Sequence, residues 1–303
     1  MNRVAVVGSL NMDMVSDVSH FPEPGETILA RSYTEIPGGK GANQAYAAAS
    51  LGSDVTILGA VGEDEIGDRL LSSLASVGVD TSHIKKSQKI DGFTGRAFIT
   101  VDPSGQNNIV VAGGANLEVD ILYIKEHLHV IDDCDVLLLQ LEIPLETVIF
   151  CASYAHKLGK TVILDPAPVS SPLPTSLLES IDIITPNELE IHMLTDQTSK
   201  SSIDVLADEL CKMHVPNVIV TLGSEGSRLY KASGEVTHVP SIPVKVVDTT
   251  AAGDAYAGAL GHAIALNCSI DEAMHLATKV ASIVVSKKGA SSSMPTRGEV
   301  SRN

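Results

Sequence analysis

Val247-Asp248-Thr249-Thr250-Ala251-Ala252-Gly253-Asp254 runs directly into the alanine-rich segment 255–260. Thr249 and Thr250 are good capping residues, and the alanines that follow have high helix propensity, so the sequence predicts a helix that begins here. The first free N–H groups of such a helix and the positive end of its dipole form a site for an anion. Asp254 would then place a carboxylate beside that anion.

Two interpretations of Asp254 fit this stretch. An acidic residue in a first helical turn can simply complement the helix dipole. It can also be a general base beside a phosphate, because phosphoryl transfer needs charge neutralisation on the moving group and a carboxylate that accepts the proton of the attacking hydroxyl. The stretch alone leaves both interpretations open, so the rest of the chain has to decide between them.

The composition is that of an aliphatic globular protein. The 303 residues are 44% hydrophobic, enough for a large core, and no apolar run approaches the roughly 20 residues that span a bilayer. We expect residues 1–303 to form a single domain. A strand pattern begins near Arg3 with no secretory or transit segment before it, which predicts a cytoplasmic location.

The charge balance is strongly acidic. Lys and Arg number 21 against 37 Asp and Glu, a formal net charge of −16, which disfavours nucleic acid and anionic membranes as partners. An acidic protein that binds a polyanion needs local donors, and helix N-termini or a bound cation can supply them. The cysteines are far apart without zinc or redox spacing, so we expect reduced thiols at Cys134, Cys151, Cys211 and Cys268.

Polar side chains follow the first predicted strand. Residues 3–8 form a short apolar run that ends in glycine, typical of a strand buried on both faces of a parallel sheet. Asn11 and Asp13 come next, at the carboxyl edge where open α/β sheets bind ligands. They could be turn formers, or they could offer an amide and a carboxylate to neighbouring hydroxyls.

Residues 37–45, Pro-Gly-Gly-Lys-Gly-Ala-Asn-Gln-Ala, form a glycine-rich segment that leads into a helical run. This is not a phosphate-binding P-loop, because Gly41 follows Lys40 where Ser or Thr would hold magnesium. Nor is it a dinucleotide fingerprint, because Gln44 stands where the third glycine should be. The segment therefore predicts a second helix N-terminus that carries Lys40 and Asn43 as directed polar groups.

Strands and helices alternate through most of the chain. Apolar strand patterns occur at 54–59, 135–139, 161–164, 181–184 and 217–223. Helical patterns occur at 64–76, near 119–128, near 145–157, from 188 and near 201–213. This alternation predicts an α/β fold with a doubly wound, mainly parallel sheet and helices on both faces.

A hairpin pattern interrupts the alternation. Residues 94–101 and 108–111, joined by the turn 102–105, read as an antiparallel hairpin. With residues 12–18 and 27–36 it would form a small β-sheet outside the main one, inserted from about 12–18, 27–36 and 93–112. Such a sheet could cover a site as a lid, or bury its face against another subunit.

Further polar segments follow later strands, at 140–142, 185–190 and 221–226. In the second of these, Asn187 and Glu190 have the spacing of a capping box, in which the two side chains satisfy the first N–H groups of a helix. The alternative is that both hold waters around Mg²⁺, which keeps much of its hydration shell in nucleotide sites.

Together these segments resemble one family, the ribokinase-like (PfkB-type) carbohydrate kinases. Six motifs carry the resemblance, in matching order over nearly the whole chain: Gly8–Asp13, Gly38–Ala45, Gln140–Glu142, Thr185–Glu188, Thr221–Gly226 and Asp248–Asp254. The resemblance implies a ribokinase-like fold and ATP-dependent transfer of a phosphoryl group to the 5-hydroxyl of D-ribose. It also implies a homodimer formed through the β-lid.

The resemblance also implies site residues. Asp254 would be the base, and Ala251, Ala252 and Gly253 would form the anion nest. The sugar would be held by Asn11, Asp13, Gly39, Lys40, Gly41, Asn43, Glu142 and Asp254. ATP would be held by Asn187, Thr221, Leu222, Gly223, Ser224, Glu225, Gly226, Gly253 and Thr278.

Two metal ions follow from the same resemblance. Mg²⁺ would be held through water by Asn187 and Glu190. A monovalent cation, K⁺, would order the loop that carries the nest. Its ligands would be Asp248, Thr250, Val284, Lys287, Gly289 and Ser293.

This sequence departs from the family pattern at two places. Many members have glycine where this chain has Ala251, so we expect the backbone there to avoid positive φ. The chain ends soon after Pro295, so a final helix should be short or missing.

Two rival functions remain at this point. One is a kinase of the same fold that acts on fructose, deoxyribose or a nucleoside. A nucleoside usually requires an aromatic or broad apolar surface, so the polar set from Asn11 to Glu142 suits a bare polyol better. The other is a noncatalytic sugar-binding protein built on this fold.

Overall fold

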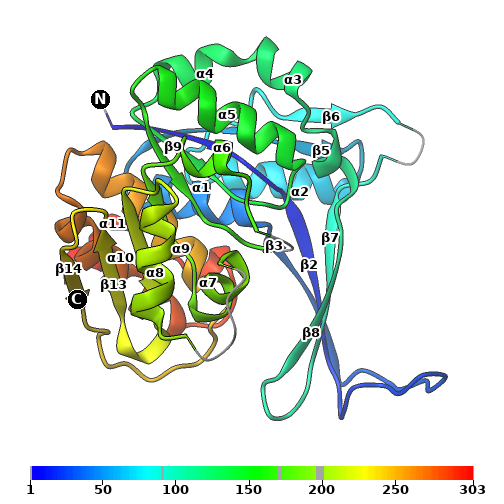
Figure 1. Ribbon diagram of the computed structural model, residues 1–303. Helices are drawn as coiled ribbons and strands as arrows, with labels where there is room; N and C mark the ends of the chain where they lie inside the picture. The colour runs from blue at the N-terminus through cyan, green and yellow to red at the C-terminus, as the bar shows by residue number, and fades with distance from the viewer. Residues whose placement is uncertain (1, 90–91, 170–171, 196–200, 303) are drawn as a thin grey trace.

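The main sheet lies between two layers of helices (Figure 1). The computed structural model describes residues 2–89, 92–169, 172–195 and 201–302. Within these ranges the sheet has eight strands, in the spatial order β14 (Val236–Val239), β13 (Ser227–Lys231), β12 (Asn217–Thr221), β11 (Ile183–Ile184), β10 (Thr161–Leu164), β9 (Val136–Leu139), β1 (Arg3–Val7) and β4 (Asp54–Leu58). From β12 to β4 all neighbours are parallel, whereas β13 is antiparallel to both β12 and β14.

Both faces of the sheet are buried, which explains the continuous apolar strands. In β1, Val4 and Val6 belong to one core cluster, and Ala5 and Val7 belong to the other. The first cluster packs under α1 (Lys40–Ser50), α2 (Glu65–Ala75), α9 (Ala252–Ala265), α10 (Ile270–Val285) and α11 (Arg297–Arg302). The second packs under α3 (Ile121–Glu126), α4 (Leu128–Asp133), α5 (Leu145–Lys157), α6 (Thr175–Leu178), α7 (Glu188–Leu194) and α8 (Ile203–Lys212).

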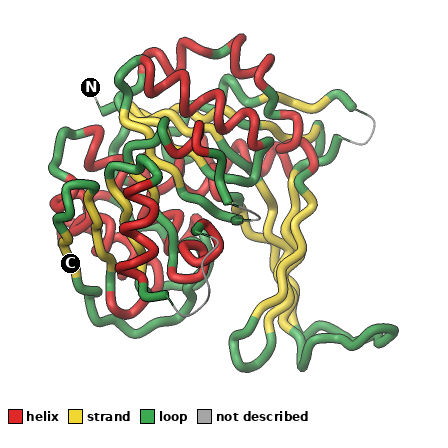
Figure 2. Tube along the Cα trace, viewed as in Figure 1, coloured by secondary structure: helices red, strands yellow, loops and turns green. Residues whose placement is uncertain are grey.

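A small four-stranded sheet projects from this body as an arm (Figure 2). Its strands, in spatial order, are β3 (Ser32–Gly38), β2 (Asn11–Asp17), β7 (Gly95–Val101) and β8 (Asn107–Ala112). Pro37 is tolerated in β3 because that strand lies at the sheet edge. The remaining short elements are β5 (Ala60–Gly62), β6 (Lys85–Ser87) and the 3₁₀ helices η1 (Gly114–Glu118), η2 (Gly223–Glu225) and η3 (Ser291–Ser293).

The predicted α/β class and the separate small sheet are confirmed, and two local predictions are wrong. The helix predicted near 119–128 is two short helices, because the backbone of His127 leaves the helical region between them. The strand predicted at 27–36 begins only at Ser32. The edge hairpin β13–β14 was not predicted from the sequence. The final helix, α11, is short, as expected. No helix among the described residues is both long and apolar enough to cross a membrane.

The helices α1 and α9 cross in close contact at Gly258. A Cβ atom there would lie 2.6 Å from the Gln44 carbonyl oxygen and 2.7 Å from the Ala47 Cβ. Since both helices start at the same edge of the sheet, this contact fixes the relative positions of their N-termini.

We predict that Gly258→Ala lowers the free energy of unfolding by about 1–3 kcal/mol, because the added methyl group overpacks the contact between α1 and α9. Urea unfolding followed by circular dichroism measures the change. The matched control is Gly298→Ala on α11, which is exposed and has only the Thr296 hydroxyl within 4.0 Å of its added Cβ. The control should be neutral or stabilising by up to about 1 kcal/mol. Equal destabilisation by both variants would contradict the prediction.

Candidate active site

Asp254 lies in the first turn of α9, and only one of its two carboxylate oxygens accepts a hydrogen bond from the part of the chain that the structure describes. The side chain is buried, with 7% of its surface exposed. Its Oδ2 accepts a hydrogen bond of 2.8 Å from Asn43 Nδ2. Its Oδ1 has no hydrogen-bond partner among the described residues and lies 3.8 Å from Lys40 Nζ. The carboxylate is therefore held in place with an oxygen left to accept a proton.

The backbone before α9 forms a concave amide site. Ala251 has φ 58° and ψ 14°, in the left-handed region, so the expectation that its backbone avoids positive φ is wrong. A left-handed residue directly before a helix turns successive N–H groups toward one point, the geometry of an anion nest. Within the described chain, the N–H groups of Gly253 and Asp254 have no backbone acceptor. A Cβ on Gly253 would meet no atom within 4 Å, so the space beside this residue is open.

The predicted threonine cap of α9 is also wrong. Ala251 is the N-cap residue, and it makes no side-chain capping bond. The Thr250 hydroxyl and N–H instead donate to Asp248 Oδ1, at 2.6 and 2.9 Å. Asp248 Oδ2 accepts from the Gly289 N–H at 3.0 Å, so this carboxylate joins the loops before α9 and after α10. The Thr250 hydroxyl is thus held by a charged acceptor and does not cap the helix, whose first N–H, that of Ala252, donates to the Thr249 carbonyl oxygen at 3.3 Å.

Opposite Asp254, the residues after β1 meet the start of α1. Glu142 Oε2 accepts hydrogen bonds from Ser9 Oγ at 2.5 Å, Lys40 N at 3.2 Å and Asn11 Nδ2 at 3.3 Å. The glycines allow this approach. A Cβ on Gly39, which has φ 90°, would lie 2.6 Å from the Asn11 nitrogen, and one on Gly41 would lie 2.6 Å from the Ser9 nitrogen.

Asp13 faces the same group of carboxylates. Burial, followed by the charges of Glu142 and Asp254, raises the pKa of Asp13 from 3.8 to about 7. A Cβ on Gly38, which pairs with Asn11, would lie 2.4 Å from Asp13 Oδ2, so this carboxylate lies beside the start of α1. The predicted sugar residues and Asp254 are therefore brought together.

Lys40 supplies the positive charge in this cluster. Its Nζ lies 3.7 Å from Asp165 Oδ2 and 3.8 Å from Asp254 Oδ1. Burial alone would lower the pKa of Lys40, but the charges of Asp165, Asp254 and Glu142 outweigh it and raise the pKa above its ordinary value. The ammonium group is thus shared between two carboxylates.

Asp165 was not predicted from the sequence. It follows strand β10, just as Glu142 follows β9, so the rule that polar residues at strand ends line the site would have found it. Its Oδ2 accepts from Gln44 Nε2 at 2.9 Å, and Gln44 Oε1 accepts from Gln140 Nε2 at 2.6 Å. Burial raises the pKa of Asp165, and the nearby Lys40 opposes that rise.

A cavity of about 720 Å³ adjoins Gly253. The predicted nucleotide residues that line it are Asn187, Thr221, Gly223, Ser224, Gly226, Gly253 and Thr278. Leu222 is buried and Glu225 is exposed, and neither lines the cavity. The sequence analysis missed the opposite wall, 241–246, where Ile242, Val244 and Val246 expose apolar side chains. An apolar wall and polar groups near Gly253 suit a nucleotide with its phosphates toward the nest.

Asn187 and Glu190 form the capping box that the sequence left as one alternative. Asn187 Oδ1 accepts from the Leu189 and Glu190 N–H groups, each at 2.9 Å, and Glu190 Oε2 accepts from the Asn187 N–H at 2.9 Å. The charge of Glu190 also acts on Lys40 and Asp165. Asn187 lies on the rim of the nucleotide cavity, and the capping bond fixes the Glu190 carboxylate beside the Asn187 backbone.

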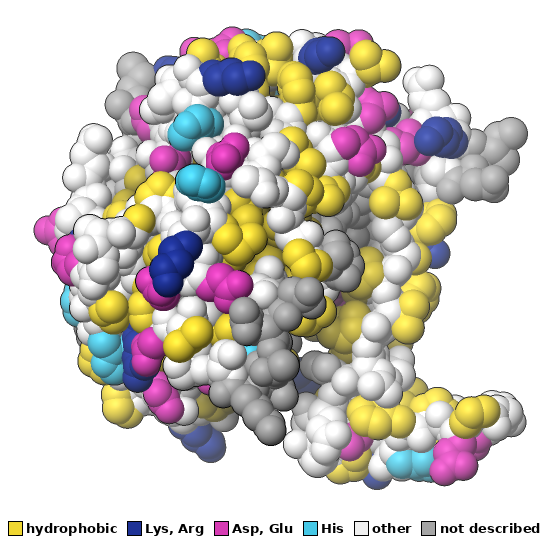
Figure 3. All heavy atoms as spheres, viewed as in Figure 1, with side chains coloured by type: hydrophobic (Ala, Val, Ile, Leu, Met, Phe, Trp, Pro, Cys, Tyr) yellow, Lys and Arg dark blue, Asp and Glu magenta, His cyan; other side chains and the backbone are white. Residues whose placement is uncertain are grey.

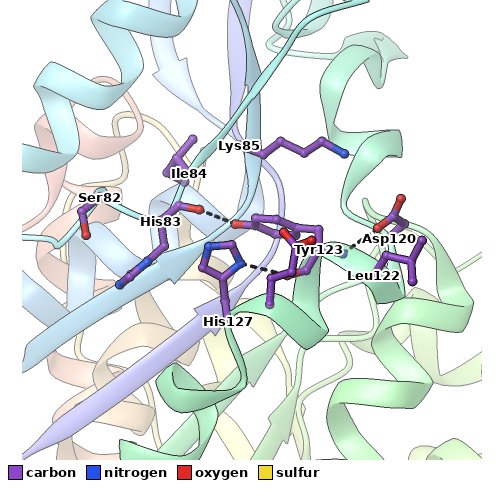
Figure 4. Close-up of a pocket in the computed structure, with 9 residues that line it drawn as sticks. Ser82, His83, Ile84, Lys85, Asp120, Leu122, Tyr123 and His127 are labelled. Carbon is purple, nitrogen blue, oxygen red and sulfur yellow. Dashed lines mark hydrogen bonds between the residues drawn. The ribbon is translucent and has the colours of Figure 1, made fainter.

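A second cavity, of about 330 Å³, lies between the segment 82–85 and α3 (Figure 4). The Tyr123 hydroxyl donates to the His83 carbonyl oxygen at 2.6 Å, and His127 Nδ1 bonds the Tyr123 carbonyl oxygen at 2.8 Å. Among the described residues no group of three or more His, Cys, Asp or Glu side chains could hold a metal ion, the nearby histidines included. This cavity contains none of the predicted site residues.

Comparison with known proteins decides the family. Residues 1–297 match the profile of the pfkB family of carbohydrate kinases. The chain belongs to this family. It is 40% identical over 303 residues to a ribokinase of Haemophilus influenzae, with 98% of this chain and 96% of that protein covered. A deoxyribokinase of Salmonella typhi is 35% identical over 295 residues, with 97% and 95% covered.

The fold of this carbohydrate kinase matches solved structures of the same family. A ribokinase of Arabidopsis thaliana, solved with ribose and ATP, has a TM-score of 0.90 at 34% identity, covering 99% of this chain and 97% of that one. A ribokinase of Thermotoga maritima has the same TM-score at 38% identity, covering 99% and 98%. The chain is thus a phosphotransferase that acts on a sugar hydroxyl, which favours the enzymatic interpretation over a noncatalytic sugar-binding protein.

We predict that the carbohydrate kinase loses stability through Asp13 as pH rises. Because the folded protein holds this proton more tightly than the unfolded chain, the stabilising contribution is present below about pH 4 and is lost through about pH 7. Asp13→Asn removes the titration. The variant should therefore gain on the order of 2–4 kcal/mol over the unsubstituted protein between pH 4 and 7. Urea unfolding at several pH values measures the difference, and a difference that does not change with pH would contradict the assignment.

Proposed function

We propose that this carbohydrate kinase transfers the terminal phosphoryl group of ATP to the 5-hydroxyl of D-ribose. One observation carries the proposal: Asp254, in the first turn of α9, is held by Asn43 through Oδ2, while its Oδ1 lies beside Lys40 with no hydrogen bond among the described residues. The relatives named above support the choice of substrates, since a ribokinase that binds ribose and ATP shares the fold over nearly the whole chain.

The reaction is an in-line transfer. The sugar oxygen forms a bond to the terminal phosphorus, and the bond from that phosphorus to the bridging oxygen of ADP breaks. The proton of the sugar hydroxyl passes to Asp254 Oδ1. The amides beside Ala251, Ala252 and Gly253 face the phosphoryl oxygens and stabilise their charge, while Lys40 offsets the negative charge of Asp254 and Asp165.

The sugar is bound by groups that suit hydroxyls. Asn11, Asp13, Asn43 and Glu142 present amides and carboxylates, and Gly39 and Gly41 let the backbone approach. This polar set suits a bare polyol better than a nucleoside, which usually requires an aromatic or broad apolar surface. Deoxyribose is the second candidate, because a deoxyribokinase is 35% identical to this chain. ADP release measured over a panel of sugars separates the two, and turnover of deoxyribose without ribose would overturn the proposal.

Mg²⁺ fits the nucleotide side of the site. Asn187 and Glu190 would hold it through water, because Asn187 lines the nucleotide cavity and the capping bonds of α7 fix both side chains there. When bound, the ion neutralises charge on the phosphates of ATP.

K⁺ fits the paired loops beside the nest. Asp248 and Thr250 lie before α9, and Gly289 is tied to Asp248 by a hydrogen bond of 3.0 Å. Val284 lies in α10, Lys287 in the turn that follows, and Ser293 in η3. A cation held there would order the Ala251 backbone without touching the substrates.

We predict that Asp254→Asn lowers kcat for ribose by about 10²–10⁴, the usual contribution of a general base, while the KM values change only a few-fold. The amide oxygen of the new side chain can still accept the bond from Asn43. Steady-state kinetics with a coupled ADP assay measures both constants. Undiminished kcat in the folded variant would remove Asp254 from the mechanism.

We further propose that the small sheet is a lid that pairs with the lid of a second copy of the chain. Apolar side chains are visible on the arm in Figure 3, and the exposed apolar residues of its strands lie on both faces of the sheet. Phe98 and Val110 are paired on one face, with 47% and 68% of their surfaces exposed, and Ile109 and Val111 lie on the other, with 53% and 47% exposed. A thin sheet that is apolar on both sides is stable in water only when a partner covers one of them.

We predict that one of the variants Ile109→Lys and Val110→Lys, which place the charge on opposite faces of the small sheet, converts a homodimer into a monomer, because a charge on the covered face cannot be buried. Light scattering should give twice the chain mass before substitution and the chain mass after it. Val236→Lys is the matched control, since Val236 is 57% exposed on the edge strand β14 and far from the lid. A monomeric unsubstituted protein would refute the proposed dimer.

A further inference from the structure

Asn116 is a buried polar residue outside the site residues described so far. It lies in η1, just after strand β8, and 0% of its surface is exposed. Its Oδ1 accepts a hydrogen bond from the Leu10 N–H at 2.9 Å. Its Nδ2 donates to the Leu10 carbonyl oxygen at 3.1 Å and to Asn11 Oδ1 at 2.7 Å. Asn116 therefore links the backbone of the β1–β2 connection to the side chain of Asn11.

The backbone of Leu10 fixes which way the Asn116 amide points. An N–H group can only donate and a carbonyl can only accept, so Asn116 must place Oδ1 at the Leu10 nitrogen and Nδ2 at the Leu10 oxygen. The same Nδ2 then faces Asn11, which must answer with its own oxygen. At the far end of Asn11, the carboxylate of Glu142 accepts from Nδ2 at 3.3 Å. Both neighbours therefore require the same orientation of the Asn11 amide.

Gly95 closes the third side of this contact. It is paired with Asn11 between β2 and β7, and a Cβ there would lie 2.1 Å from Asn11 Oδ1 and 2.4 Å from Asn116 Nδ2. The bases of β2, β7 and β8 thus meet at one pair of buried amides. Asn11 cannot change its rotamer without disturbing the base of the small sheet.

We infer that Asn116 is a positioning residue for sugar binding, which presents the NH₂ end of Asn11, and not its carbonyl, to the substrate. The inference rests on the proposed function only in assuming that Asn11 contacts the sugar. Asn116 itself has no solvent-exposed surface and does not touch the substrate. Asn116 thereby selects for a sugar oxygen that accepts a hydrogen bond from Asn11 Nδ2. It also couples this hydrogen bond to the position of the small sheet.

The test is the isosteric variant Asn116→Asp. Its carboxylate still accepts from the Leu10 N–H but cannot donate to Asn11, so Asn11 Oδ1 loses its donor and is repelled by the new carboxylate, and the Asn11 amide is no longer held in one orientation. We expect the KM for the sugar to rise at least tenfold, while kcat and the KM for ATP stay within about threefold. Steady-state kinetics at varied sugar and at varied ATP separates these constants.

Ser87→Ala is the matched control. It removes the 2.6 Å hydrogen bond from Ser87 Oγ to Glu118, in the same η1 helix, without reaching Asn11. It should leave the KM for the sugar unchanged. If Asn116→Asp does not fold, Gly95→Ala replaces it, since the added methyl group pushes the same two amides apart and should also raise the KM for the sugar.

The outcomes separate the inference from the proposed function. If the unsubstituted enzyme phosphorylates another sugar and not ribose, the proposed substrate fails, and the same variants are compared with that sugar. An unchanged sugar KM in folded Asn116→Asp overturns the inference, and so does an equal rise in Ser87→Ala. A selective rise in Asn116→Asp supports it whichever sugar is the acceptor.

Discussion

The site depends on one ammonium group among several carboxylates. Lys40 Nζ lies between Asp165 and Asp254, and the charge of Glu142 acts on it as well. Carboxylates gathered in a buried site repel one another, and removing the cation would leave uncompensated charge where water cannot screen it. Lys40 is also the first residue of α1, so the positive end of that helix reinforces its charge. The sugar and the phosphate must both bind without upsetting the balance between the Lys40 charge and these carboxylates.

The fold explains how an acidic chain can bind a polyanion. The ends of β1, β9 and β10 bring acidic and amide side chains to one edge of the sheet, and the N-termini of α1 and α9 meet at the same edge. The close contact at Gly258 holds those two positive helix ends together. A formal charge of −16 spread over the chain is then overcome locally by oriented amides and one lysine.

The sequence predicted the parts of the structure that have a local pattern. Strands buried on both faces are continuous apolar runs, and the residues after them, such as Asn11 and Glu142, lie at the sheet edge because parallel strands end together. The left-handed backbone of Ala251 has no such pattern, since it follows from the bonds of Asp248 to Thr250 and Gly289. Asn116 was missed for a similar reason, because its partner Asn11 is 105 residues away.

The residues proposed for sugar binding come from two parts of the fold, and this division has a consequence. Lys40, Asn43 and Glu142 belong to the main body, whereas Asn11 and Asp13 are the first residues of β2 in the small sheet. The Asn11–Glu142 hydrogen bond crosses the boundary between them, and Asn116 anchors the same asparagine to the base of that sheet. A sugar held by both groups therefore adds bonds across this boundary, so its binding energy depends on where the small sheet lies. The small sheet does not need to touch the phosphate to influence phosphoryl transfer. Its position helps to set where the sugar hydroxyl lies relative to Asp254.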